Sequence, residues 1–203
     1  TVDLLQTLAT RHRVIDYQGV FNFSSINNSA VRCFGEEISS FLFMNNDIEA
    51  IEAGWLENMR DLLGRREVGI VGATLLYPPT VSIDSKSDLA ETARFAIESP
   101  SATKNSKDGP PDVGPAEKLP CLIQHAGVML NVGLAEHYQK FEPHHDAYRQ
   151  NIVQNPAVPS LVTRTFSAVT AACMLTRRDV FEVLSGFDDA LAVGYQDVDL
   201  CLR

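Results

Sequence analysis

An apolar run that ends abruptly in polar residues stands out at residues 41–50, which read FLFMNNDIEA. The run over residues 38–44 is too short for an ordinary helix and lacks polar alternation, so it predicts a strand buried on both faces. Asn45, Asn46 and Asp47 follow at its carboxyl end, where ligands bind in open α/β sheets. A carboxylate between amides there suits a divalent cation with a diphosphate. A plain Asn/Asp turn after a strand is an equally good interpretation.

Helical and strand patterns alternate around this run. Apolar positions at helical spacing after Ser24 or Ser25 predict a helix that Gly35 ends. Residues 54–63 predict a second helix, and residues 68–75 (VGIVGATL) a second buried strand. The order helix, strand, helix, strand is typical of a βαβ unit, so we expect an α/β fold with a mainly parallel central sheet flanked by helices.

The pattern breaks at Pro78. Seven of the ten prolines lie between Pro78 and Pro120, and residues 79–119 predict a long insertion or mobile loop. Regular patterns then return. Residues 121–132 predict a strand broken at Gly127, and residues 163–176 predict a second strand. Residues 178–184 predict a helix, and residues 198–203 the start of a last helix.

Composition narrows the partners and the compartment. The chain has 203 residues, 45% of them hydrophobic, which suits a single domain. A net charge of −9 argues against nucleic acid as the main partner. No apolar run reaches the ~18 residues of a membrane span. The cysteines include no CxxC pair, so we expect buried free thiols and a cytoplasmic protein, either free or peripheral at the inner face of the membrane.

Two carboxylate clusters are candidates for chemistry. Asp47 with Glu49 is the first, and Asp197 with Asp199 is the second. Asp197 falls at the predicted start of a helix, where it either stabilises the helix end or acts as a general base toward an acceptor hydroxyl. The histidines are weaker candidates for a metal site. The pair at residues 144–145 is more typical of a solvated loop, and His125 is more typical of a buried polar residue with a hydrogen-bond partner. No P-loop, GxGxxG, HExxH or GxSxG motif is present.

Several segments resemble one enzyme family, in the right order. Residues 21–59 resemble the first half of the family 2 glycosyltransferases, which are inverting enzymes with a GT-A fold that use nucleotide-sugars, and residues 68–78 continue the match. IQHAGV at residues 123–128 is similar to a segment of the subgroup that builds bacterial surface polysaccharides. Residues 167–203, which include SGFDDALAVGYQDVDLCLR, resemble the acceptor-side segment of that family. The resemblance implies a GT-A (Rossmann-like) nucleotide-diphospho-sugar transferase fold.

The resemblance also implies roles on the donor side. Asn45, Asn46 and Asp47 stand where the family has its DxD-type motif, with Asn45 in place of the first carboxylate. Asp47 would then hold Mg²⁺ or Mn²⁺ against the diphosphate of the nucleotide-sugar donor. Asn28 matches, more weakly, an asparagine close to the donor.

On the acceptor side, Asp197 matches the second acidic residue of the family's ED motif, the presumed catalytic base. Gln196 replaces the first acidic residue, which puts the role of that position in doubt. Gly186, Phe187 and Asp188 resemble the GGFD stretch near the acceptor site.

The resemblance implies a glycosyltransferase that moves a sugar, with inversion, from a nucleotide-diphosphate donor to a glycan or lipid-linked acceptor in polysaccharide or cell-envelope biosynthesis. The family's first strand with its uracil-side Asp, and a metal-binding His after residue 203, are missing from the chain. We therefore expect a partial domain, incomplete at both ends and inactive alone, whose exposed strand edge favours a homo-oligomer. The alternative is a non-catalytic or truncated module that binds a glycan or protein partner; a nucleotidyltransferase would predict a Gly-rich signature that is not seen.

Overall fold

The computed structural model describes residues 7–77, 122–131, 134–142, 144 and 162–203. The chain divides into two compact units, the first made of Thr1–Ala73, Gly127–Glu136 and Phe166–Arg203, the second of Thr74–Ala126 and His137–Thr165. The single-domain assignment stays a prediction. The predicted insertion at residues 79–119 lies outside the described residues, as does His145.

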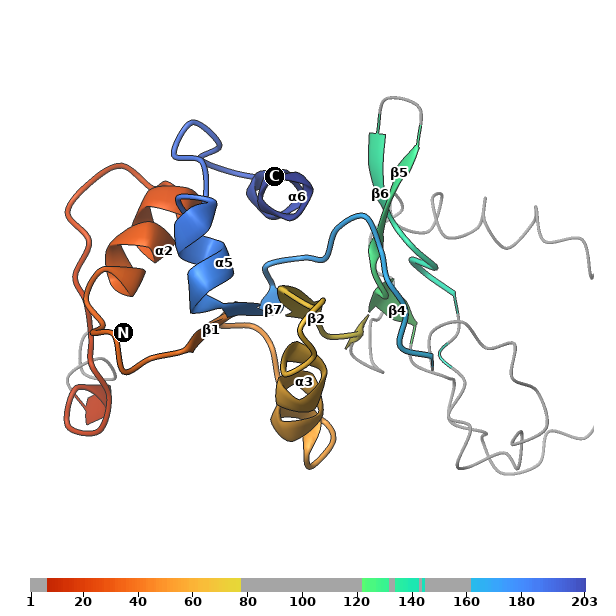
Figure 1. The fold of residues 1–203 in the computed structure, drawn as a ribbon, viewed down its shortest axis with the longest axis horizontal. Coiled ribbons are helices and arrows are strands. Elements are labelled where there is room, and N and C mark those ends of the chain that lie inside the picture. Colours follow the sequence, from red (N-terminus) through yellow and green to blue (C-terminus); the bar gives the residue numbers. More distant parts are fainter. Residues whose placement is uncertain (1–6, 78–121, 132–133, 143, 145–161) are drawn as a thin grey trace, which may run out of the picture. The chain divides into compact units, whose positions relative to one another are not determined.

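The centre of the first unit is a three-stranded sheet in the order β1-β7-β2 (Figure 1). The strands are β1 (Ser40–Met44), β7 (Cys173–Arg177) and β2 (Ile70–Gly72). Both outer strands run antiparallel to β7, so that Met44 lies opposite Cys173 and Gly72 opposite Met174. The protein is therefore a mixed α/β structure with small antiparallel sheets, and the expected parallel sheet is not confirmed.

The sequence pattern located the strands but not their direction, and β1 is not buried on both faces as predicted: Phe41 and Phe43 are buried, while Met44 is 44% exposed. Four of the five residues of β7 are buried, as a middle strand requires. Because an apolar run looks the same in either direction, the βαβ rhythm of β1, α3 and β2 did not reveal that a strand more than a hundred residues later separates β1 from β2.

An aromatic core covers one face of this sheet. It joins β1 to α2 (Phe23–Val31), α5 (Arg178–Val183) and α6 (Gln196–Leu202). Figure 1 shows α2 and α5 side by side above the strands. Phe43 lies edge-on to Phe187, with ring centroids 4.9 Å apart, and such pairs add about 1 kcal/mol beyond burial. The buried members of the core are Phe41, Phe43, Ala171, Met174, Phe181, Phe187 and Leu200.

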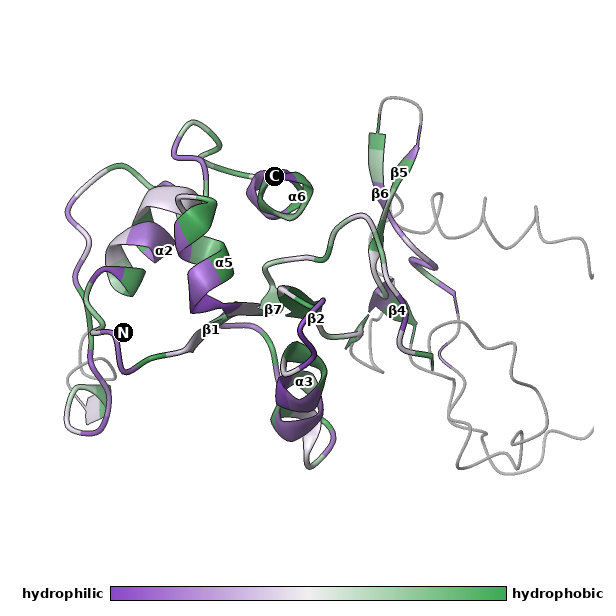
Figure 2. Ribbon diagram, viewed as in Figure 1, coloured by the Kyte–Doolittle hydropathy of each residue, from purple (hydrophilic) through white to green (hydrophobic). Residues whose placement is uncertain are grey.

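The opposite face is covered by α3 (Trp55–Leu63), which begins after Gly54. Met59 and Leu63, four residues apart, are buried, as the helical spacing predicted. Figure 2 shows both hydrophobic and hydrophilic residues on this helix, as expected for a helix with one side on the sheet and the other facing solvent.

Capping explains where α2 begins. The side chain of Asn22 accepts a hydrogen bond from the backbone N–H of Ser25 (2.9 Å), so Asn22 is the N-cap in place of the predicted Ser24 or Ser25. Ser24 is fully buried and donates to the carbonyl of Leu191 (2.8 Å). A hydroxyl that would suit a cap therefore ties α2 to the loop before α6.

The segment at residues 121–132 breaks at Gly127, which confirms that prediction. In the second unit, β3 (Leu75–Leu76) pairs with β4 (Ile123–His125). The hairpin of β5 (Val128–Asn131) and β6 (Leu134–His137) follows, and all but its last residue belongs to the first unit. Gly127 has a φ of +122°, and a Cβ there would meet the Phe166 ring at 2.4 Å, so only glycine fits. None of the helices in the described ranges is long and apolar enough to cross a membrane.

Candidate functional site

The short segment before β7, residues 168–172, connects three regions that are distant in sequence. Ala168 forms a β-bridge with Val128 at the start of β5. The N–H of Ala171 donates to Oδ2 of Asp197 (3.0 Å), and the carbonyl of Ala172 accepts from the N–H of Asn45 (2.9 Å). The carboxyl end of β1, the start of α6 and the β5–β6 hairpin therefore meet at one end of the sheet.

The predicted donor motif lies in an exposed turn at this end. Asn45, Asn46 and Asp47 are all exposed, directly after the last residue of β1. Only the backbone of Asn45 is held by the sheet. The Asp47 carboxylate forms no ion pair with any residue that the structure describes, so its oxygens face solvent.

The metal ligands that the protein itself offers here are few. Within the described ranges, no group of three or more His, Cys, Asp or Glu side chains is arranged to hold a metal ion. One carboxylate and neighbouring amide oxygens do suit Mg²⁺, which commonly binds through one or two carboxylates together with substrate phosphates. The residues present therefore fit a cation that arrives with a diphosphate, and do not fit an all-protein metal site.

Asp197 is half-buried in the first turn of α6 and is held in place by backbone donors. Its Oδ2 accepts from Ala171 and its Oδ1 from the N–H of Val198 (2.9 Å). A carboxylate oxygen can accept two hydrogen bonds, and each Asp197 oxygen accepts one from the described residues, so one lone pair on each remains. Burial and, less strongly, the negative charge of Asp197 raise the pKa of the nearby Cys201 thiol.

The neighbours of Asp197 differ from it. Asp199 pairs with Arg203 one helical turn later (2.8 Å). Gln196 is buried, and its Oε1 finds no hydrogen-bond donor within the described part of the chain. A carboxylate at position 196 would be a buried charge that needs a partner, so the neutral amide is the residue that suits this environment.

Asn28 is buried and all of its side-chain polar atoms contact the loop after α5. Its Nδ2 donates to the carbonyl of Phe187 (2.8 Å) and to Oδ1 of Asp189 (3.0 Å), and its Oδ1 accepts from the N–H of Phe187 (3.0 Å). A direct contact with a donor would have to replace one of these hydrogen bonds. Its donor-binding role stays a prediction that the geometry does not favour.

The same loop holds the predicted acceptor residues. Gly186, at a φ of +72°, packs against Asn28 with no room for a Cβ, and Phe187 is only 2% exposed in the aromatic core. Asp188 is exposed and accepts from the N–H of Ala190 (2.9 Å). Of the three, only the Asp188 side chain is open to a ligand, so the acceptor role of this stretch stays a prediction.

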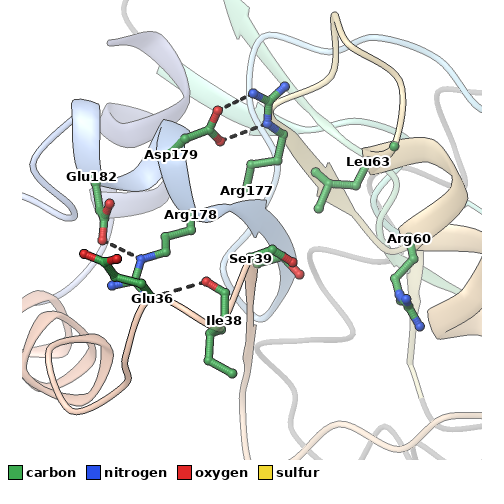
Figure 3. A pocket seen from close by; sticks show the side chains of 11 residues that line it. Glu36, Ile38, Ser39, Arg60, Leu63, Arg177, Arg178, Asp179 and Glu182 are labelled. Carbon is green, nitrogen blue, oxygen red and sulfur yellow. Dashed lines mark hydrogen bonds and ion pairs between the residues drawn. The ribbon is translucent and has the colours of Figure 1, made fainter.

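A cavity of about 640 Å³ lies at the other end of the sheet, where β1 begins and β7 ends (Figure 3). Arg177 pairs there with Asp179, and Arg178 with Glu182 (2.6 Å). Two of its arginines are therefore already ion-paired, and none of the predicted site residues lines this cavity. Its lining is Glu36, Ile38, Ser39, Ser40, Arg60, Leu63, Gly64, Arg177, Arg178, Asp179 and Glu182.

In the second unit, the buried His125 packs edge-on against His137, with ring centroids 4.8 Å apart. Burial and, less strongly, the charge of His137 lower the pKa of His125 to about 3. His125 is therefore neutral at physiological pH and belongs to the packing of this unit.

Sequence reasoning missed the role of residues 168–172, because their contribution is made by backbone N–H and C=O groups that every residue has. It also missed Tyr195. The signal there was a bulky residue after Gly194 and before a helix, since the structure gives Tyr195 a φ of +63°, a conformation that aromatic residues rarely adopt.

Comparison with known proteins finds two curated relatives and no matching family model or solved structure. The chain is 32% identical over 198 residues to a Sinorhizobium fredii protein named "Uncharacterized protein y4gI". It is 30% identical over 184 residues to "O-antigen biosynthesis protein RfbC" of Myxococcus xanthus. These matches take in 95% and 90% of the chain but 16% and 11% of the relatives. The chain thus spans about a sixth or less of the length of the curated relatives it matches.

Proposed function

We propose that this chain carries the catalytic end of a nucleotide-sugar-dependent glycosyltransferase that acts in the biosynthesis of a surface polysaccharide. The observation that carries the proposal is the meeting of the Asn45–Asp47 turn and Asp197 on the adjacent residues Ala171 and Ala172. The name of the Myxococcus relative supports the polysaccharide context, and the family resemblance of residues 167–203 supports the reaction class.

In this proposal Asp197 is the general base. It accepts the proton of an acceptor hydroxyl while that oxygen attacks the anomeric carbon and the bond from this carbon to the diphosphate oxygen breaks, with inversion. The N–H groups of Ala171 and Val198 fix the direction of the carboxylate. Positioned proton transfer of this kind contributes about 10²–10⁴-fold to the rate.

Asp47, with Asn45 and Asn46, would hold Mg²⁺ or Mn²⁺ together with the donor diphosphate. When bound, such a cation neutralises the charge of the leaving diphosphate. The exposure of all three side chains suits a group that becomes complete only when the donor arrives.

The competing candidate is a non-catalytic glycan- or protein-binding module, and a specific observation favours it. The hydrogen bond from Ala171 shows that Asp197 already has a structural task, which is to tie α6 to the segment before β7. A residue with that task alone would be needed for stability and not for turnover.

The test uses the complete gene product with UDP-, GDP- and dTDP-sugars and Mg²⁺ or Mn²⁺, and measures release of the nucleoside diphosphate in the presence of oligosaccharide acceptors. We expect Asp197→Asn, which keeps the shape and an acceptor oxygen, to lower kcat by about 10²–10⁴-fold. Asp47→Asn should abolish turnover without changing the melting temperature, since little packing is lost at an exposed turn.

Asp61→Asn is the matched control, because Asp61 lies exposed on α3 away from this end of the sheet. It should leave both turnover and melting temperature unchanged. Near-normal turnover in Asp197→Asn would contradict the base assignment, while a wild type that releases no nucleoside diphosphate from any of the donors would favour the non-catalytic module. A crippled Asp199→Asn with an active Asp197→Asn would move the base to the other carboxylate.

A further inference from the structure

The first unit has a second cavity that none of the predicted site residues lines. It measures about 330 Å³ and is lined by Leu130, Asn131, Leu134, Ala135 and Tyr195. All five residues belong to the first unit. The cavity thus lies between the β5–β6 hairpin and the residue two positions before the proposed base.

The lining is exposed and mostly apolar. Leu130, Leu134 and Tyr195 are 45%, 60% and 58% exposed, although burying such side chains fully is worth about 1.5–3 kcal/mol each. Asn131 adds an amide to one side. A cavity near the small end of the range for small-molecule sites, apolar with a few polar groups, has the make-up of a ligand site.

The backbone of Tyr195 is strained. Its φ of +63° places it in the left-handed region, which costs a residue with a Cβ about 1–2 kcal/mol. Glycine or asparagine would make the same turn into α6 at lower cost. Since strain of this kind gathers at binding and catalytic sites, Tyr195 is a candidate for a role beyond the turn.

Three contacts fix the cavity relative to Asp197. The carbonyl of Tyr195 accepts from the N–H of Asp199 (2.8 Å), within the first turn of α6. The N–H of Val128, at the start of β5, donates to the carbonyl of Ala168 (2.8 Å). Ala168 lies three residues before Ala171, whose N–H donates to Asp197. The hairpin wall is therefore anchored to the segment that holds the proposed base, and the Tyr195 wall to the helix that carries it.

We propose that Tyr195 and the β5–β6 hairpin form a subsite for a sugar ring of the acceptor, so that Tyr195 is a specificity-determining residue. The C–H groups on one face of a pyranose make that face apolar, so that it can stack on an aromatic ring such as that of Tyr195. The acceptor is the partner that must approach the general base, so a subsite next to Asp197 belongs to it. The inference rests on the proposed function only for the assignment of the ligand as the acceptor. That the ligand is a sugar is inferred from the lining of the cavity.

The test is saturation-transfer NMR of the complete gene product with methyl α- and β-glycosides of glucose, galactose, mannose and rhamnose. We expect binding of at least one glycoside. We expect Tyr195→Phe to retain it and Tyr195→Gly to weaken it about tenfold or more, the equivalent of one lost aromatic contact. Because glycine relieves the strained backbone, Tyr195→Gly should fold with an equal or higher melting temperature, which separates a binding role from a structural one.

Val193→Ala is the matched control, because Val193 is 75% exposed and does not line the cavity. It should bind the glycosides like the wild type. Unchanged binding in Tyr195→Gly, or binding to none of the glycosides, would overturn the inference. Glycoside binding that depends on Tyr195 in a protein that releases no nucleoside diphosphate from any donor would uphold the sugar subsite and contradict only the proposed catalysis.

Discussion

The buried imidazole of His125 predicts that the protein loses stability as the pH falls below neutrality. His125 is 1% exposed at the end of β4. Burial, followed by the charge of His137, lowers its pKa from 6.5 to about 3. The His125 ring is therefore protonated near pH 6.5 in the unfolded chain, but only near pH 3 in the folded chain.

The magnitude follows from this difference in proton uptake. The stabilising contribution is complete above the unfolded pKa of about 6.5 and is lost, at up to ~1.4 kcal/mol per pH unit, as the pH falls toward the folded value. Between pH 7 and pH 5 the free energy of unfolding should drop by about 2 kcal/mol from this group alone.

Urea unfolding of the wild type and of His125→Gln, at pH 7 and pH 5, measures this contribution. Glutamine does not titrate, so the variant should lack about 2 kcal/mol of the pH dependence. His137→Gln, which removes only the smaller electrostatic cause, should keep most of it. Equal pH dependence in the wild type and His125→Gln, or an NMR titration of the His125 ring near pH 6.5, would refute the reasoning.

Two further substitutions test the packing around the site. Asn28→Ala leaves the buried N–H and C=O of Phe187 without partners, so the free energy of unfolding in urea should fall by about 2–5 kcal/mol; a loss under 1 kcal/mol would show that water replaces the amide. Gly127→Ala forces a Cβ into the Phe166 ring and should lower the melting temperature by ten degrees or more. Gly64→Ala, whose Cβ would meet nothing closer than 3.5 Å, is its control and should melt as the wild type does.

Local features of the fold were predictable because they depend on local chemistry. The unbroken apolar run of β1, the helical spacing of α3 and the break at Gly127 all follow from side-chain size and periodicity within a few residues. The division of residues 68–75 between β2 and β3 was not predictable, since nothing in VGIVGATL marks where one sheet ends and another begins.

The carboxylates of the candidate site were predictable, but the backbone segment that holds them in place was not. Asp47 and Asp197 stood out as charged residues beside apolar strands and helices. The segment that joins them consists of small residues whose backbone atoms form the links. Asn28 was predicted to lie near the donor from the family resemblance alone, and that role stays a prediction. The structure uses its amide to hold the buried loop after α5.

The central position of β7 has a consequence for synthesis. When β1 and β2 leave the ribosome, their common partner has not been made: Cys173 follows Gly72 by 101 residues. At about 5–20 residues per second, both strands wait roughly 5–20 s with unpaired edges. Over that interval the nascent chain presents two apolar strands that are ready to pair with any other extended segment. The yield of folded protein would then depend on how well these two strands are kept apart from other extended segments until β7 is made.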